Sequence, residues 1–264
     1  MPLHLPLASI HSGRGPLVIA CHGVTDTASA LGDLIYRLHD RYHVVALDTL
    51  GHGLSREATP EECREPLPAA LRALSESVEL LVAEYGPAVG IGHSMGGGLI
   101  TRLAADHPQW FVGVVGEDPA WLSAERAQQY QENLPDSVAY HQQVRQNPAQ
   151  TLATNYQEFP SWPQRDRCGW LDGKLAVDLT YLAAGNVGYP DWQLWATNLR
   201  IPTLIITGDA PGVVIGRAGV EQIHALNNPQ IETVVIPEAP HCVRRHNPEE
   251  FHRILDEFLA RVHP

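Results

Sequence analysis

Short runs of apolar residues recur along the chain, separated by longer stretches with a helical hydrophobic period. The apolar runs predict buried strands near residues 17–20, 43–47, 88–92, 111–116, 203–207 and 231–236. The intervening stretches predict helices near residues 29–39, 66–85, 96–106, 217–226 and 248–261. Because strands and helices alternate and the strands are apolar throughout, the pattern favours an α/β fold with a mostly parallel sheet covered on both faces.

Residues 120–198 interrupt this alternation. They hold five of the six tryptophans and predict several short helices, near residues 123–133, 135–146 and 148–157. We therefore expect two parts: a core domain made of residues 1–119 and 199–264, and a helical cap formed by the insertion 120–198. The segments 158–163 and 186–190 are expected to be irregular parts of that cap.

A nucleophilic serine is indicated by the pentapeptide Gly92-His93-Ser94-Met95-Gly96, which follows an apolar run and precedes a helical stretch. A turn this tight strains the backbone of its central residue, and a Cβ at either flanking glycine would clash with the neighbouring strand and helix. The Ser94 hydroxyl is then exposed at a helix N-terminus, where the helix dipole favours developing negative charge.

Main-chain donors for an oxyanion are expected from the loop 21–24, which follows the first apolar strand. The N–H groups of Val24 and Met95 would together form an oxyanion hole. A second tight glycine turn follows the next strand and contains Asp48 and His52. We expect these two residues to fix their loop by hydrogen bonds rather than to take part in chemistry.

A serine hydroxyl needs a base within hydrogen-bond reach, and an imidazole titrates in the right range. His241 lies on a loop between the last predicted strand and the C-terminal helix, where the base belongs in the order serine, acid, histidine. His246 is a nearby rival for the same role.

As a set, these motifs resemble the α/β-hydrolase fold superfamily, from about residue 15 to residue 260. The resemblance is carried by His22-Gly23, the segment 48–55, the pentapeptide around Ser94 and the late His241. It implies a cofactor-free serine hydrolase of the esterase or lactonase kind, with a helical lid inserted over the serine.

The resemblance leaves two carboxylates as candidates for the triad acid. In most of the superfamily the acid follows the strand after the cap, but the corresponding position here is Pro211, so Asp209 is expected to be a turn residue. A minority carries the acid one strand earlier, after the sixth strand, where this chain has Glu117 and Asp118. Successive strand side chains point in opposite directions, so only one can face the histidine. Counting from His107 as in those relatives favours Asp118, with Glu117 as the alternative.

The tryptophans of the cap are expected to line an apolar pocket, with Trp121, Trp162 and Trp192 as the candidate substrate contacts. The resulting expectation is hydrolysis of a small or medium hydrophobic carboxylic ester or lactone through an acyl-enzyme. A C–C bond hydrolase, an acyltransferase or a perhydrolase could use the same triad. A non-catalytic ligand receptor on this fold is the alternative from a different class.

Composition and sequence pattern limit which classes of partner are expected. The formal net charge of −12 would repel phosphate backbones, so no nucleic-acid partner is expected. The first twenty residues lack a signal-peptide pattern and no run of eighteen apolar residues occurs, which favours a cytoplasmic protein with no membrane partner. The four cysteines show no zinc-site spacing, so no metal is expected. A monomer or a homodimer is compatible with the sequence.

Overall fold

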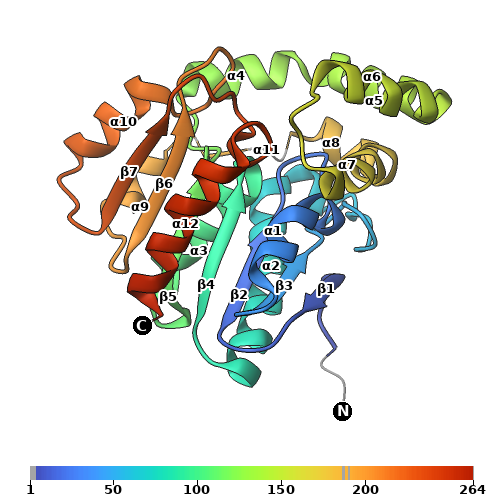
Figure 1. Ribbon diagram of the computed structural model, residues 1–264. Coiled ribbons are helices and arrows are strands. Elements are labelled where there is room, and N and C mark those ends of the chain that lie inside the picture. Colours follow the sequence, from blue (N-terminus) through green and yellow to red (C-terminus); the bar gives the residue numbers. More distant parts are fainter. Residues whose placement is uncertain (1–3, 186–187, 190, 264) are drawn as a thin grey trace.

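The computed structural model describes residues 4–185, 188–189 and 191–263, and within them a seven-stranded sheet forms the centre of the molecule (Figure 1). The strand order is β1-β3-β2-β4-β5-β6-β7, and only the edge strand β1 runs antiparallel to its neighbour. The strands are β1 (Ser9–Ser12), β2 (Leu17–Cys21), β3 (His43–Leu47), β4 (Ala88–His93), β5 (Phe111–Glu117), β6 (Thr203–Gly208) and β7 (Ile231–Ile236). The predicted mostly parallel α/β sheet is confirmed.

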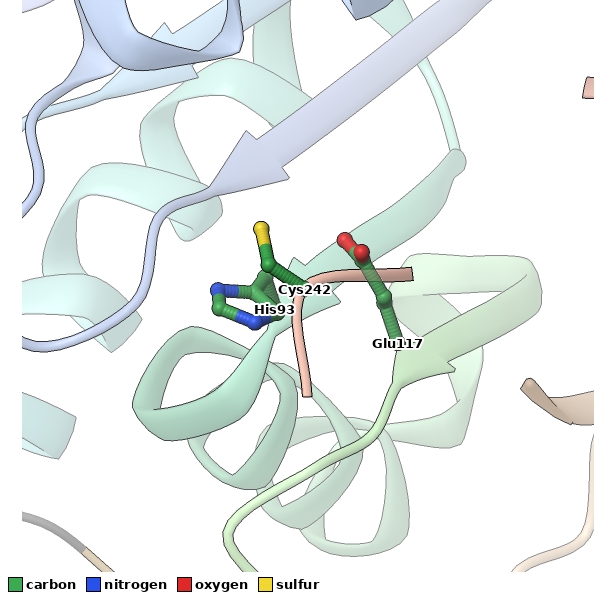
Figure 2. Close-up of side chains that lie close together, drawn as sticks. All are labelled: His93, Glu117 and Cys242. Carbon is green, nitrogen blue, oxygen red and sulfur yellow. The ribbon is translucent and has the colours of Figure 1, made fainter. Parts of the chain in front are cut away.

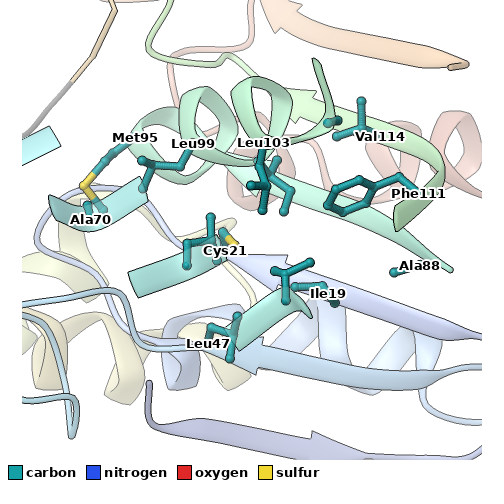
Figure 3. Packing of buried hydrophobic residues seen from close by; sticks show 14 of the residues in the cluster. Ile19, Cys21, Leu47, Ala70, Ala88, Met95, Leu99, Leu103, Phe111 and Val114 are labelled. Carbon is teal, nitrogen blue, oxygen red and sulfur yellow. The ribbon is translucent and has the colours of Figure 1, made fainter. Parts of the chain in front are cut away.

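Helices cover both faces of the sheet, which explains why the strands are apolar at every position. In β2, Leu17 and Ile19 pack with Leu99 and its neighbours on one face, whereas Val18 packs with Phe251 on the other. Figure 3 shows the first of these layers, between α3 and the strands. The covering helices are α2 (Pro66–Tyr85), α3 (Ser94–Asp106) and α10 (Gly216–Ala225) on one face, and α1 (Gly32–Leu38) and α12 (Pro248–Val262) on the other.

The order of the strands determines where a ligand can bind. The chain builds outward from β2 to β3, then returns to the other side of β2 with β4. In an open parallel sheet, such a reversal leaves a crevice beyond the carboxyl ends of the strands. The loop after β2 and the start of α3 after β4 meet at this crevice, and they carry Val24 and Ser94.

The residues between β5 and β6 form a series of helices. Their bounds are α4 (Ala124–Glu132), α5 (Leu134–Gln146), α6 (Pro148–Glu158), α7 (Gln164–Ala176), α8 (Leu179–Ala183) and α9 (Trp192–Ala196). The first three coincide with the helices expected from the sequence. Figure 1 shows α4 to α8 beyond the carboxyl ends of the strands, while α9 packs beside α3. Residues 186, 187 and 190 of the segment expected to be irregular lie outside the described residues.

Four short elements complete the described chain. They are the 3₁₀ helices η1 (Ala28–Leu31), η2 (Glu62–Arg64) and η3 (Pro108–Trp110), and the short helix α11 (Val243–His246). Within the described ranges, no helix combines the length and the apolar character needed to cross a bilayer.

Buried ion pairs join the helical insertion to the core. Lys174 of α7 donates to Asp26 (3.1 Å) and to the carbonyl of Thr25 (2.8 Å), in the loop after β2. Arg245 of α11 binds the other oxygen of Asp26 (2.8 Å) and also Asp166 of α7 (3.3 Å). All four charged side chains are buried. Because each charge is compensated within the network, α7 is held against the loop that follows β2.

We expect the Arg245→Met substitution to lower the free energy of unfolding by about 3–5 kcal/mol, because it leaves Asp26 and Asp166 short of a buried counter-charge. Urea denaturation at neutral pH measures this loss. Arg253→Met is the matched control, since Arg253 makes two ion pairs that are exposed on α12. Equal denaturation midpoints for the two variants would contradict the role given to the buried network.

Hydrogen bonds from three buried side chains fix the loops after β2 and β3. His22 accepts from the main-chain N–H of Thr49 (3.0 Å), and His52 accepts from that of Thr25 (3.3 Å). The two oxygens of Asp48 accept from main-chain N–H groups on either side of it. Asp48 and His52 thus have the architectural contacts expected from the sequence. Burial lowers the pKa of His22 to about 4 and that of His52 to about 3.

The burial of His22 and His52 predicts that the fold loses stability in acid. In the unfolded chain the two imidazoles take up protons near pH 6.5, whereas in the folded chain they do so only near pH 4 or below. Their contribution to stability is therefore complete above about pH 6.5 and is lost as the pH falls toward 4, by on the order of 1 kcal/mol per pH unit for each imidazole. Urea denaturation between about pH 6.5 and 4.5 measures this slope. His22→Gln should flatten it, with exposed His4→Gln as control, and an unchanged slope would refute the assignment.

Candidate active site

Ser94 lies at a strained turn between β4 and α3. Its φ angle is 51°, in the left-handed region, and its side chain is largely buried. A Cβ at Gly92 would overlap the backbone of Gly96, and a Cβ at Gly96 would overlap the carbonyls of Cys21 and His22. This close approach lets the Gly96 N–H donate to the His22 carbonyl (3.1 Å). The two glycines therefore bring the loop after β2 to the serine.

His241 is bound to Asp118. The His241 Nδ1 lies 2.6 Å from Oδ2 of Asp118, which is completely buried at the end of β5. Asp118 also accepts from the hydroxyl of Thr207 (2.6 Å) and from the main-chain N–H groups of Val214 (2.8 Å) and Ile215 (2.9 Å). Burial alone would raise the pKa of Asp118, but His241 and these donors hold it below the ordinary value. Asp118 is thus ionised and fixed in orientation.

Glu117 faces the opposite side of the strand. Its two oxygens accept from the main-chain N–H (2.7 Å) and the guanidinium (2.6 Å) of Arg244, and both side chains are buried. Although burial opposes ionisation, Arg244 keeps the pKa of Glu117 below its ordinary value. The structure therefore brings Asp118 to His241 and gives Glu117 a different partner.

Two other polar residues considered from the sequence have partners away from Ser94. The Nε2 of His246 accepts a hydrogen bond from the indole of Trp162 (2.9 Å). Asp209 binds Arg217 (2.6 Å) and accepts from the main-chain N–H of Glu238 (2.7 Å), as expected for a turn residue.

His93, which the sequence reasoning did not single out, binds the loop that carries His241. Its Nε2 lies 3.2 Å from the carbonyl oxygen of His241, and the two rings are 4.8 Å apart. Burial lowers the pKa of His93, so the ring is neutral and Nε2 acts as the donor. The only sequence signal was its position directly before the serine, which places it at the end of β4.

A cavity of about 320 Å³ opens beside Ser94. Its described lining contains Val24, Ser94, Ala120, Leu122, Arg126, Gln129, Tyr130, Asn133, Val214 and His241. Ser94, His241 and one of the two expected oxyanion donors, Val24, thus meet in one cavity. Met95 follows Ser94 in the chain, and its side chain is buried in the core. A larger cavity of about 660 Å³ lies between the turn after β3 and the loop from α7 to α8, but its described lining contains no histidine.

The structure does not bring the three tryptophans expected to contact substrate into this cavity. Trp121 donates from its indole to the hydroxyl of Thr101 (3.0 Å) and stacks on Trp192, with ring centroids 4.9 Å apart. Trp162 donates to His246. Burying an indole is favourable when its N–H finds a partner, and here the partners lie within the protein. These rings pack the insertion onto the core.

Three side chains of metal-ligand type, His93, Glu117 and Cys242, lie together, with ligand atoms within 4.8 Å of one another (Figure 2). Both oxygens of Glu117 are taken by Arg244, whose guanidinium also lies 3.6 Å from the Cys242 sulfur. Burial raises the pKa of the Cys242 thiol, which favours its uncharged form. A buried guanidinium beside a neutral thiol repels a cation, so this donor set does not favour a metal.

Comparisons with known proteins agree with this architecture. A 2-(acetamidomethylene)succinate hydrolase from Mesorhizobium japonicum is 26% identical over 259 residues, covering 94% of this chain and 89% of that protein. An epoxide hydrolase from Bacillus megaterium superposes with a TM-score of 0.76 at 18% identity, over 96% of each chain. An enol-lactonase from Burkholderia xenovorans superposes with a TM-score of 0.71 at 19% identity, also over 96% of each chain. At such identities the two solved structures show the fold alone.

The family described as serine aminopeptidase, S33, matches residues 14–247, which is most of the chain. The match includes the turn at Ser94, the carboxylate Asp118 and the loop with His241. The resemblance to the α/β-hydrolase superfamily is thereby confirmed, and the chain belongs to the serine aminopeptidase S33 family of α/β-hydrolase fold serine hydrolases.

Proposed function

We propose that the chain is a cofactor-free serine hydrolase that cleaves a small or medium carboxylic ester or lactone through an acyl-enzyme. One observation carries the proposal: Ser94, at a strained strand–helix turn, shares a cavity with His241, and His241 is bound to a fully buried carboxylate. This combination supplies a nucleophile, a base and a group that orients the base.

In the proposed first step, His241 takes the proton of Ser94 as the hydroxyl oxygen attacks the substrate carbonyl carbon. Asp118 accepts the Nδ1–H of His241, which fixes the tautomer with a free lone pair on Nε2 and stabilises the imidazolium that forms. The carbonyl oxygen becomes an oxyanion, which the main-chain N–H groups of Val24 and Met95 would stabilise.

In the proposed second step, the tetrahedral adduct collapses, the bond from the carbonyl carbon to the alcohol oxygen breaks, and His241 donates a proton to that oxygen. An ester releases its alcohol here, whereas an opened lactone stays on Ser94 as a hydroxyacyl group. Water then attacks the acyl group on Ser94, with His241 again accepting a proton, and the acid product is released. The apolar lining residues Val24, Ala120 and Leu122 suit the carbon chain of the substrate, and a volume near 320 Å³ favours a small one.

The relative from Mesorhizobium japonicum favours a second candidate function, in which the same serine hydrolyses an amide-containing compound. Its name describes the hydrolysis of 2-(acetamidomethylene)succinate, and the match covers 94% of this chain. Hydrolysis of a compound of this kind would use the same serine, because a serine nucleophile attacks the carbonyl carbon of an amide as well as of an ester. Comparing turnover of that compound with turnover of p-nitrophenyl esters separates the two candidates.

The catalytic proposal is tested with a fluorophosphonate probe and with short and medium-chain p-nitrophenyl esters. Ser94→Ala should abolish labelling and lower kcat by at least about 10⁴-fold, because it removes the nucleophile. Asp118→Asn should lower kcat by about 10⁴-fold, because the amide favours the wrong tautomer of His241.

Glu117→Gln is the matched carboxylate control, because Glu117 is the last residue of β5 and directly precedes Asp118. Because Glu117 binds Arg244 rather than His241, its loss should lower thermal stability but keep kcat within about tenfold of the wild type. The reverse order, with Glu117→Gln inactive and Asp118→Asn active, would reject Asp118 as the acid. Labelling that persists in Ser94→Ala would reject the serine mechanism.

A further inference from the structure

The cavity beside Ser94 has two chemically different sides. Apart from Ser94 and His241, one side is apolar and consists of Val24, Ala120, Leu122 and Val214. Helix α4 and its C-cap contribute polar side chains at positions i, i+3, i+4 and i+7, which lie on one face of a helix. These four residues are Arg126, Gln129, Tyr130 and Asn133.

The four polar side chains are available to a ligand. Across residues 4–185, 188–189 and 191–263, none of them makes a side-chain hydrogen bond or ion pair. Gln128, which does not line the cavity, instead bonds to Glu132 on the same helix (2.9 Å). Arg126, Gln129 and Asn133 are exposed and Tyr130 is partly buried, so a ligand in the cavity beside Ser94 can reach all four.

The charge of this surface is positive. Arg126 is the only permanently charged side chain in the described lining, and no carboxylate is among the lining residues there. The whole chain carries a formal charge of −12, which repels anions at long range. An arginine without a carboxylate partner, in the cavity beside Ser94 of so acidic a protein, favours a substrate with a negatively charged group. A guanidinium binds a carboxylate through two parallel hydrogen bonds.

We infer that the substrate carries a carboxylate at a distance from the bond that is cleaved, and that Arg126 binds it. Gln129, Tyr130 and Asn133 then hydrogen-bond polar atoms between that carboxylate and the scissile carbonyl. This assignment rests on the proposed serine hydrolase function. It replaces the hydrophobic substrate expected from the sequence with a small anionic one. In that substrate a short carbon chain joins the carboxylate to the group that is cleaved.

The test compares charged substrates with uncharged partners of equal size. For a carboxylate on the acyl side, the pair is p-nitrophenyl hydrogen glutarate and p-nitrophenyl 4-carbamoylbutanoate. For one on the alcohol side, the pair is 4-acetoxybutanoate and 4-acetoxybutanamide. In at least one pair, wild-type kcat/KM should be at least about tenfold higher for the anion, because a hydrogen bond to a charged group contributes about ten- to a hundredfold.

Arg126→Gln should reduce this preference to near unity, and Arg126→Lys should retain part of it, because the charge remains but the two-pronged geometry is lost. Arg64→Gln removes an exposed arginine of η2 and should leave both members of each pair unchanged. Direct binding of glutarate to Ser94→Ala, measured by calorimetry, should weaken by the same factor when Arg126→Gln is added.

The outcomes separate this inference from the function on which it rests. If uncharged esters are hydrolysed but no pair shows a preference, or if Arg126→Gln lowers both members equally, the assignment of Arg126 is wrong while the hydrolase remains. If no ester is hydrolysed, the proposed function fails, and glutarate binding alone decides the role of Arg126. Glutarate binding that is unaffected by Arg126→Gln would overturn it.

Discussion

Two adjacent carboxylates at the carboxyl end of β5 bind the segment that runs from β7 into helix α11. Asp118 receives the Nδ1 of His241, and Glu117 receives the main chain and guanidinium of Arg244, three residues further on. A third bond comes from His93 at the end of the neighbouring strand, β4. His241 lies between β7 and the short helix α11, and these contacts fix its position relative to the sheet. Both acids are buried, and burial disfavours a charged carboxylate. Their partners keep both acids ionised, so the position of the proposed catalytic base rests on these paired charges.

The sheet and the turn at Ser94 could be predicted because their causes are local. An apolar run of five or six residues is compatible with a strand buried on both faces, and Gly92 is required by its contact with Gly96 in the same turn. The contact that requires Gly96, with the carbonyls of Cys21 and His22, is distant in sequence, but the five-residue pattern of the turn already contains this glycine. The edge strand β1 gave little signal, because its residues Ser9–Ser12 are partly exposed and polar, and its pairing with β3 supplies most of its order. The choice between Glu117 and Asp118 needed the structure, because it depends on which face of β5 meets His241.

The lining of the cavity beside Ser94 shows the limit of residue type as a guide. Aromatic side chains often line apolar pockets, but Trp121 and Trp162 are anchored by hydrogen bonds from their indole N–H groups to Thr101 and His246. Neither partner is close to its tryptophan in sequence. The polar residues of α4 could be read from the sequence, and their helical spacing could have placed them on one face. Nothing local showed that this face covers the serine rather than the solvent, because that depends on how the insertion sits over the sheet.

The insertion is attached unevenly, and this affects how the protein can change over evolutionary time. Helix α7 is joined to the core by Lys174 and Asp166, both buried, so substitutions there act on the fold as a whole. Helix α4 contains no buried residue and is capped locally by Ser123. Exposed positions tolerate substitution with small changes in stability. Selection can therefore remodel the surface above Ser94 almost independently of the folding free energy, which leaves the hydrolytic centre intact while the range of accepted molecules drifts.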